Sequence, residues 1–444
     1  MIKEISKALL DFISKSPTSF HVVYNAKEML LKEGFVELNR STKWELVPDG
    51  KYFTTVNNSS LIAFKLGNDL SDYSFNIVAA HDDSPTFKIK PVPVLRGTKE
   101  YTKLSVQVYG GLIQSPWLDR PLSIAGRAIV KEEKDGKTHF ITKLVNIDRD
   151  LCIIPNLAIH MNRELNQGYK YNPEIDLCPL FAQGDFTTEQ FYQLIADNIG
   201  CDPKNLVSSE LYLYPRYQGT FLGVNEEFVG SPRLDDQQCV FTGLRALITG
   251  YSSKAVDMMY IADNEEVGSS TKQGAGSSFL KDVMERINLA LGKSEEDFKV
   301  ALTKSMIVSA DNAHSIHPNH PEKTDQANYV TMNKGVVIKH AARQSYTTDA
   351  ISAAIFIECC NRAKVPYQNF AARADNPGGG TLGAISSRNV SIYSVDIGLA
   401  QLAMHSCYEV AGSQDNYFAI ASMKEFYSQH LEIREDGDIE SIHE

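Results

Sequence analysis

From about residue 230 onward, segments typical of buried strands alternate with segments typical of helices. A helix is predicted over 235–249, and the apolar run 255–261 that follows has the length of a buried strand. The alternation continues through further helices and strands, which we expect near 276–291, 306–310, 336–338, 348–363, 391–395 and 415–429. Such a pattern predicts an α/β fold in which a mainly parallel sheet is covered by helices.

The chain before residue 230 divides into two parts of different character. Residues 1–85 contain two predicted amphipathic helices followed by strands, and they fit the same domain as residues 230–444. Residues 86–229 alternate apolar and polar positions as strands do, with one predicted helix at 187–198 and a hairpin turn at 135–137. The sequence therefore predicts a discontinuous α/β domain, formed by residues 1–85 and 230–444, that is interrupted by a β-rich insertion at 86–229.

Composition argues against several functional classes. The 444 residues carry 55 acidic and 44 basic side chains, and a net charge of -11 does not suit binding to nucleic acid or to an anionic membrane. No segment approaches the roughly 18 consecutive apolar residues of a membrane-spanning helix, and the N-terminal segment does not resemble a signal peptide. The seven cysteines form no CxxC pair, so we expect neither a cysteine zinc site nor a disulfide framework, and we expect a cytoplasmic location.

The acidic segment 263–268 (DNEEVG) follows the predicted strand 255–261. Neighbouring side chains of a strand point to opposite faces, so two adjacent glutamates are unusual at this place. Past the strand end, Gly268 allows the chain to turn, and one glutamate can then bind a metal ion while the other reaches the ion's water. An isolated Glu-Glu pair is more often a solvated acidic loop, so this interpretation depends on the rest of the chain.

Other polar residues lie directly after predicted strands or at the start of a predicted helix. They are His81, Asp83, Asp235, Asp311 and His405. In open α/β sheets, ligands bind beyond the carboxyl ends of the strands. We therefore expect these side chains to converge with Glu265 and Glu266 from distant parts of the chain.

This set of side chains has the chemistry of a metal site. Imidazole and carboxylate ligands without thiolate suit zinc, and they could also suit manganese or cobalt. Two ions can share the ligands if one aspartate bridges them, and either Asp311 or Asp235 fits that role. Such a pair activates water and polarises a carbonyl group. Glu265 would remain as the general base, and Asp83 could hold the imidazole of His81 in one tautomer.

Five motifs match those of one known family in type, order and spacing. They are HDDSP at 81–85, SPRLD at 231–235, DNEEVG at 263–268, SADNAH at 309–314 and LAMHS at 402–406. On these motifs the sequence resembles the M18 family of metallo-aminopeptidases, the aspartyl aminopeptidases. The resemblance runs from Ser16 and Pro17 to the last predicted helix.

The resemblance implies a role for each residue of the set. It implies one zinc ion held by His81, Asp235 and Asp311. It implies a second zinc ion held by Asp235, Glu266 and His405, which makes Asp235 the bridging ligand. Glu265 matches the family's catalytic base.

The resemblance also implies substrate contacts at His314, Lys339 and Tyr346. Lys339 stands where the family places a cation against the acidic side chain of the substrate's N-terminal residue, and Tyr346 matches a tyrosine near that pocket. The run 375–381 (DNPGGGT) lacks the ending of a phosphate-binding loop. It fits either a tight loop whose backbone lines the substrate cleft or a purely structural turn.

The predicted insertion resembles the family at 154–160 (IPNLAIH). In the family, the histidine of this segment reaches into the active site of the neighbouring subunit. His160 would then stabilise the developing oxyanion in trans. The implied architecture is a dimer built through the insertion and assembled further into a tetrahedral dodecamer.

These expectations describe a cytoplasmic dinuclear zinc aminopeptidase that removes an N-terminal residue, preferably Asp or Glu, from peptides. Two alternatives stay open. One is an enzyme of the same family that prefers neutral N-terminal residues, in which Lys339→Ala would not harm acidic substrates selectively. The other is a hollow structural or cargo-type assembly with a vestigial site, which would contain no metal.

Overall fold

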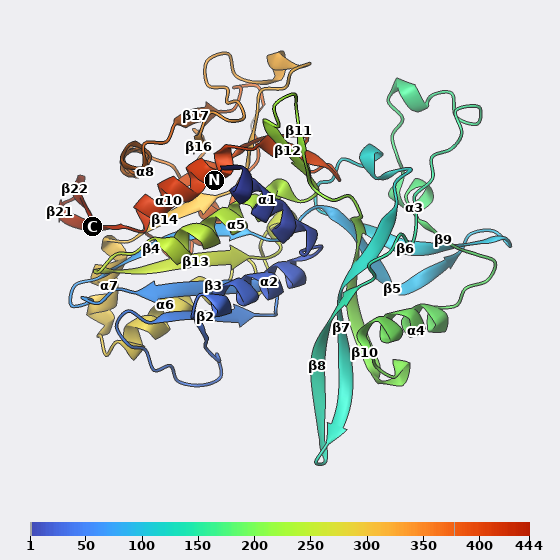
Figure 1. Cartoon of the computed structure of the whole chain (residues 1–444), viewed down its shortest axis with the longest axis horizontal. Helices are drawn as coiled ribbons and strands as arrows, with labels where there is room; N and C mark the ends of the chain where they lie inside the picture. The colour runs from blue at the N-terminus through green and yellow to red at the C-terminus, as the bar shows by residue number, and fades with distance from the viewer. Residues whose placement is uncertain (1, 377) are drawn as a thin grey trace.

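The computed structural model describes residues 2–376 and 378–444. Within them, a nine-stranded sheet has the order β1-β2-β3-β13-β4-β14-β18-β16-β17 (Figure 1). Its strands are Val36–Glu37 (β1), Lys51–Val56 (β2), Ser60–Leu66 (β3), Ser74–His81 (β4), Ala255–Ala262 (β13), Met306–Ala310 (β14), Val336–His340 (β16), Tyr367–Ala371 (β17) and Tyr393–Gly398 (β18). Strands β13, β4, β14 and β18 are mutually parallel, while β3 and β16 pair antiparallel on either side of them.

Helices cover both faces of this sheet. One layer consists of Ile2–Ser14 (α1), Ser19–Lys32 (α2), Leu234–Thr249 (α5), Ala350–Ala363 (α8) and Asp415–Phe426 (α10). The other consists of Phe279–Ala290 (α6), Glu295–Thr303 (α7) and Leu382–Ser386 (α9). Along β4, Val78 and Ala80 enter the first core, while Ile77 and Ala79 enter the second, as the two-residue period of a strand requires. The predicted α/β fold is confirmed.

A second sheet is built from the chain between β4 and α5. Its order is β8-β7-β10-β5-β6-β9, and it lies beside the nine-stranded sheet (Figure 1). The strands are Thr86–Arg96 (β5), Tyr101–Tyr109 (β6), Leu122–Lys134 (β7), Lys137–Asn146 (β8), Leu180–Gln183 (β9) and Leu206–Pro215 (β10). Helix α4 (Thr188–Ile199) packs Phe191 and Ile195 into its core. The division into domains at residues 85/86 and 229/230 stays a prediction.

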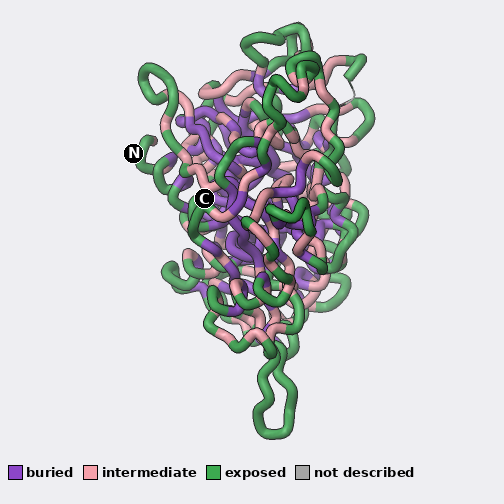
Figure 2. Tube along the Cα trace, turned by 90° about the vertical axis from the view of Figure 1, so that its right-hand side faces the viewer, coloured by how far each residue is buried: buried purple, intermediate pink, exposed green. Residues whose placement is uncertain are grey.

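The hairpin of β7 and β8 extends far from the core of this sheet. Asp135 and Gly136 form its two-residue turn, and both have the positive φ that such turns require. The turn agrees with the hairpin signal in the sequence. Figure 2 shows the end of this hairpin as an exposed arm at the bottom of the molecule.

Several elements were not predicted from the sequence. A five-stranded sheet joins Thr220–Leu222 (β11), Phe228–Ser231 (β12), Glu409–Gly412 (β20), Ala400–Leu402 (β19) and Ala313–His314 (β15). A C-terminal hairpin pairs Gln429–Glu435 (β21) with Asp438–His443 (β22). The short helices are Ser115–Trp117 (η1), Leu165–Gln167 (η2), Pro173–Asp176 (α3), Pro203–Asn205 (η3), Glu265–Val267 (η4) and Pro321–Lys323 (η5). Among the described residues, no helix is both long and apolar enough to cross a membrane.

Candidate metal centre

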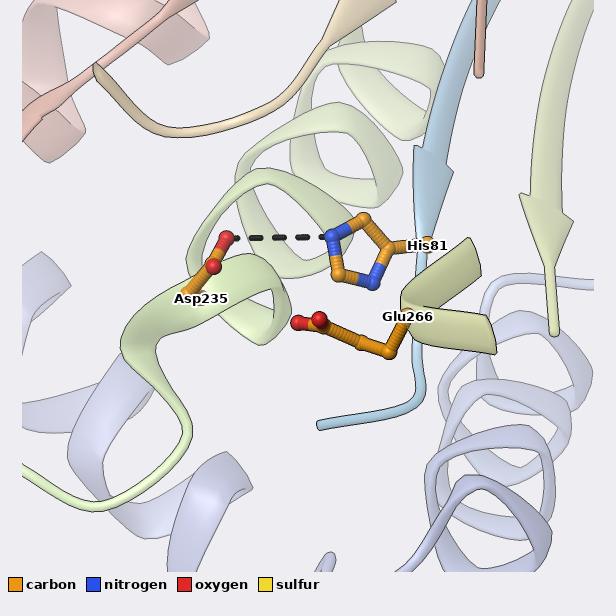
Figure 3. A group of neighbouring side chains, drawn as sticks. All are labelled: His81, Asp235 and Glu266. Carbon is orange, nitrogen blue, oxygen red and sulfur yellow. Dashed lines mark ion pairs between the residues drawn. The ribbon is translucent and has the colours of Figure 1, made fainter. Parts of the chain in front are cut away.

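The carboxyl ends of β4 and β13 bring the first polar residues together. The two strands are parallel neighbours, and Ala262 lies opposite His81 at the end of the pairing. The turn of η4 follows β13 and carries the two adjacent glutamates, while Asp235 lies in the first turn of α5. Figure 3 shows His81, Asp235 and Glu266 pointing toward one another from these three elements.

Asp235 lies between two imidazole rings. Its Oδ1 is 3.7 Å from Nε2 of His81, and its Oδ2 is 3.5 Å from Nε2 of His405. The same Nε2 of His405 is 3.5 Å from Oε1 of Glu266. One carboxylate thus faces both histidines, with a separate oxygen for each.

The donor atoms fit a metal ion. One ligand atom each of His81, Asp235 and Glu266 lies within 4.8 Å of the others. Oδ1 of Asp235 and Oε1 of Glu266 are buried and have no hydrogen-bond partner among the described residues. Buried carboxylate oxygens without partners are costly, and a cation removes that cost. Imidazole and carboxylate together form a donor set that zinc accepts.

A second group of donors involves the neighbouring aspartate. Ligand atoms of His81, Asp236 and Asp311 also lie within 4.8 Å of one another. Oδ2 of Asp236 accepts a hydrogen bond from the backbone N–H of His81 at 3.3 Å, and its Oδ1 is buried without a partner in the described chain. Asp236 was not among the residues singled out from the sequence, although it follows Asp235 directly.

Asp83 connects the histidine with the two glutamates. Its Oδ1 accepts a hydrogen bond from the N–H of Glu265 at 3.0 Å, and its Oδ2 accepts one from the N–H of Glu266 at 3.2 Å. Nδ1 of His81 lies 3.0 Å from the carbonyl oxygen of Asp83. This acceptor favours the tautomer that carries hydrogen on Nδ1 and leaves Nε2 free to bind a cation.

The side chain of Glu265 lies in a partly buried and acidic environment. Burial and the carboxylates of Asp311, Asp83 and Asp235 raise its pKa to about 7, against the opposing charge of His81. A cation bound nearby would oppose this shift, because it favours the ionised carboxylate. Without a cation, the surroundings of Glu265 therefore favour its protonated form more than water does.

Lys339 is buried and lies next to Asp311. Its Nζ is 3.7 Å from Oδ2 of Asp311, and it donates a hydrogen bond to the carbonyl oxygen of Asn312 at 3.0 Å. Burial lowers the pKa of Lys339, but the Asp311 carboxylate and other nearby groups raise it well above its ordinary value. The ammonium also lies 5.2 Å from the centre of the Tyr346 ring.

The remaining predicted residues lie in different surroundings. His314 lies in β15 with part of its surface exposed to solvent, and partial burial of its ring, followed by the charge of Lys339, lowers its pKa. His160 is exposed on the segment between β8 and η2. Within the described chain it belongs to neither group of donors around His81.

Sequence reasoning missed three residues that hold this centre in place. Glu409 accepts hydrogen bonds from the N–H of Asp235 at 3.0 Å and from the N–H of His405 at 2.8 Å. Tyr109 donates to Oδ2 of Asp83 at 2.7 Å, and Nδ1 of His405 lies 3.0 Å from the carbonyl oxygen of Gly111. Their partners are remote in sequence, and the sequence carries no motif that would have identified them.

The fold and the donor set are compatible with a metal-dependent hydrolase, and comparison with known proteins gives the family of the chain. The family model "Aminopeptidase I zinc metalloprotease (M18)" matches residues 12–427. The chain therefore belongs to the M18 family, and it is an aminopeptidase that hydrolyses peptide bonds as a metalloprotease.

Two relatives and two solved structures illustrate the similarity. The probable M18 family aminopeptidase 2 of Clostridium acetobutylicum is 45% identical over 431 residues, which cover 96% of this chain and 99% of the relative. The protein of the same description from Ectopseudomonas mendocina is 38% identical, with coverage of 96% and 99%. The structure of the Ape4 and Nbr1 complex matches with a TM-score of 0.92 at 35% identity, and the match covers 96% of this chain and 86% of that chain. The crystal structure of prApe1 matches with a TM-score of 0.89 at 28% identity, and the match covers 96% of this chain and 94% of that chain.

Proposed function

We propose that this aminopeptidase binds two zinc ions and removes N-terminal residues, preferably Asp or Glu, from peptides. One ion would be held by His81, Asp235 and Asp311. The other would be held by Asp235, Glu266 and His405. The observation that carries the proposal is the position of Asp235, whose two carboxylate oxygens face His81 and His405 separately. Mn²⁺ and Co²⁺ accept the same donors and are substitutes to be tested.

The residues of the site divide the chemical work. Bound zinc ions polarise a carbonyl group and lower the pKa of water. Glu265 would take the proton of the attacking water and pass it to the leaving amine. Asp83 would orient the imidazole of His81 and, through the N–H groups it accepts, hold Glu265 and Glu266 in fixed positions.

The geometry also supports a positioning role for Asp236. It belongs to the group of donors with His81 and Asp311, and it accepts the N–H of His81. We propose that Asp236 positions His81 and Asp311, while Asp235 is the bridging ligand. Zinc content separates the roles: Asp235→Asn should lose both ions, and Asp236→Asn should retain at least one.

The preference for acidic N-terminal residues rests on three side chains. The Lys339 ammonium, with the Tyr346 ring beside it, supplies positive charge next to Asp311, and His314 is the third proposed substrate contact. A preference for neutral residues is the second candidate. It is favoured by the burial of Lys339, which is 2% exposed and already faces the Asp311 carboxylate.

A panel of N-terminal residues, assayed with metal-replete enzyme, tests the preference. If Lys339 recognises acidic side chains, Lys339→Ala should lower kcat/KM for aspartyl-p-nitroanilide by at least about tenfold, the order expected when a charged hydrogen bond is lost. Hydrolysis of alanyl-p-nitroanilide should change much less. Equal losses for both substrates would favour a structural role for Lys339 and the preference for neutral residues.

We also propose a homo-oligomer in which residues 86–229 form a dimer interface. His160 would enter the site of a neighbouring subunit, and Leu157, Ile159 and Met161 around it are exposed apolar residues that an interface would cover. The S. cerevisiae mApe1 dodecamer, which matches with a TM-score of 0.83 at 28% identity, supports a dodecamer as the larger assembly, and we propose that its symmetry is tetrahedral.

The free cysteines support a cytoplasmic location, because a reducing compartment keeps thiols unpaired. A cargo-type assembly with a vestigial site is disfavoured. The family is one of active metalloproteases, and the histidines and carboxylates of the centre are all present. Elemental analysis of the purified protein tests this point, since a vestigial site would contain no zinc.

A further inference from the structure

Two buried polar side chains lie side by side on the sheet next to the metal centre. Ser309 of β14 and Asp396 of β18 are direct partners in the parallel pairing of these strands, and both are completely buried. Ser309 precedes Asp311 by two residues. Neither side chain belongs to the donor groups around His81.

Asp396 accepts hydrogen bonds from two segments that are distant in sequence. Its Oδ2 accepts from the N–H of Thr347 at 2.5 Å and from the hydroxyl of Thr347 at 2.7 Å. Its Oδ1 accepts from the hydroxyl of Thr381. The N–H of Asp396 in turn donates to the hydroxyl of Thr348 at 2.9 Å. One carboxylate thus fixes the segment around residue 347 and the segment around residue 381.

The segment around residue 381 packs closely against Ser309 and Asp396. Thr381 stands at the N-cap of α9, but its hydroxyl bonds to Asp396 and makes no capping bond to the helix. The N–H of Gly383 donates to the hydroxyl of Ser309 at 3.1 Å. A Cβ atom at Gly383 would lie 2.8 Å from Cβ of Ser309 and 3.1 Å from Oδ1 of Asp396, so only glycine allows this approach.

Both segments carry residues close to the proposed substrate contacts Lys339 and Tyr346. Tyr346 directly precedes Thr347, and its ring lies 5.2 Å from Nζ of Lys339. Gly378 and Gly380 precede Thr381 and are exposed. A Cβ atom at Gly378 would lie 3.9 Å from the hydroxyl of Tyr346, and one at Gly380 would lie 3.6 Å from the carbonyl oxygen of Ser345. The two segments therefore lie against each other.

We propose that Asp396 is a positioning residue that fixes both walls of the substrate pocket, through Thr347 on one wall and Thr381 on the other. This inference rests on the proposed function, because it assumes that Tyr346 and the glycine segment border the substrate. Asp396 does not touch the substrate. It restricts the conformational flexibility of the two segments, so the pocket is formed before the substrate binds. The entropic cost of ordering the segments on binding is therefore smaller.

The carboxylate suits this task better than a neutral side chain would. It accepts three hydrogen bonds from Thr347 and Thr381 with its two oxygens. Asparagine has the same shape but only one accepting oxygen, so Asp396→Asn must lose at least one of the three hydrogen bonds.

Steady-state kinetics with aspartyl- and alanyl-p-nitroanilide tests the proposal. Thr347→Val, Thr381→Val and Asp396→Asn should each raise KM about tenfold for the preferred substrate, while kcat changes less than about threefold. Zinc content should stay at the wild-type value. Thr347→Ser and Thr381→Ser keep the hydroxyl and should restore KM.

Asp415→Asn is the matched control. Asp415 is also a completely buried carboxylate, and it accepts the backbone N–H groups of Asn333 and Gly335 instead. The Asp415→Asn substitution should lower the free energy of unfolding and leave KM unchanged. If the two valine variants also keep the wild-type KM and lose only stability, the positioning role is wrong. The valine variants keep the test decisive if Asp396→Asn does not fold.

The same data separate this proposal from the proposed function. A wild-type enzyme that favours the alanyl substrate contradicts the preference for acidic residues, and the comparison of KM values is then made with that substrate. An unchanged KM in active valine variants contradicts only the role of Asp396.

Discussion

At the scale of single side chains, Asp83 connects the two adjacent glutamates with His81. Its two carboxylate oxygens accept the N–H groups of Glu265 and Glu266, and its Oδ1 lies 3.4 Å from Nδ1 of His81. Groups of this kind orient ligands, and their loss commonly costs 10- to 100-fold in metal affinity or activity. A single substitution therefore tests whether the proposed base and the proposed ligands are positioned together.

We expect Asp83→Ala to lower kcat by about 10- to 100-fold and to weaken zinc binding by a similar factor. Zinc titration and steady-state kinetics measure the two effects on the same preparation. Asp69→Ala is the control, because Asp69 is a surface residue whose carboxylate accepts hydrogen bonds from Ser71 in its own turn. Equal zinc affinity in Asp83→Ala and the wild type would contradict this role.

His21 gives a prediction about acid stability. It is buried in α2, and Nδ1 lies 2.8 Å from the hydroxyl of Thr18. Burial, and secondarily the charge of Arg233, lowers its pKa to about 4, below the value of about 6.5 in an unfolded chain. The folded state thus prefers the neutral ring. Its contribution to stability is complete above pH 6.5 and decreases as the pH falls toward 4.

The shift corresponds to about 3 kcal/mol between pH 7 and pH 4. Urea unfolding of metal-free protein should therefore show a smaller loss of unfolding free energy over this range in His21→Gln than in the wild type. Metal-free protein is needed because acid also removes zinc from its ligands. If both proteins lose the same free energy, His21 does not resist protonation.

At the scale of elements, helix caps decide where several helices begin. Ser294 precedes α7, and its hydroxyl accepts the N–H of Asp297 while the Asp297 carboxylate accepts the N–H of Ser294. Ser294→Ala should lower the unfolding free energy by about 1 kcal/mol, the usual value of an N-cap, without changing kcat. Ser278→Ala is the matched control, because Ser278 stands at the N-cap of α6 without a capping bond. Equal losses in urea unfolding would contradict the cap.

The sequence predicted long elements better than short ones. Helix α5 and strand β13 were found because apolar periodicity and length identify them. The candidate ligands were singled out because they follow predicted strands or, for Asp235, begin a predicted helix. The five-stranded sheet was missed because its strands, such as Ala313–His314, are too short to show periodicity. Glu409 was missed for another reason: it acts through backbone N–H groups remote in sequence, and no local pattern indicates such contacts.

At the scale of the whole molecule, the proposed role of His160 would make each site depend on a second chain. His160 lies on the segment between β8 and η2, and the described donor groups around His81 do not include it. The sequence indicated this residue only through a motif, since a single chain gives no geometry for a contact between subunits. Mixed assemblies can test whether it acts in trans.

We expect His160→Ala and Glu265→Gln to be nearly inactive alone and to regain activity when they are co-assembled. A subunit with His160→Ala keeps Glu265 and can receive an intact His160 from its Glu265→Gln neighbour. Activity is measured after co-expression of two differently tagged chains and tandem purification. Mixed assemblies as inactive as either variant would place His160 in the site of its own chain or outside the mechanism.

The most direct test of the account compares two adjacent glutamates. Glu265 is proposed as the base and Glu266 as a metal ligand, so the same substitution should have different effects at the two positions. We expect Glu265→Gln to lower kcat by at least about a hundredfold with unchanged zinc content. We expect Glu266→Gln to lose one zinc ion. Near-normal turnover in Glu265→Gln, or the same loss of zinc in both variants, would contradict the account.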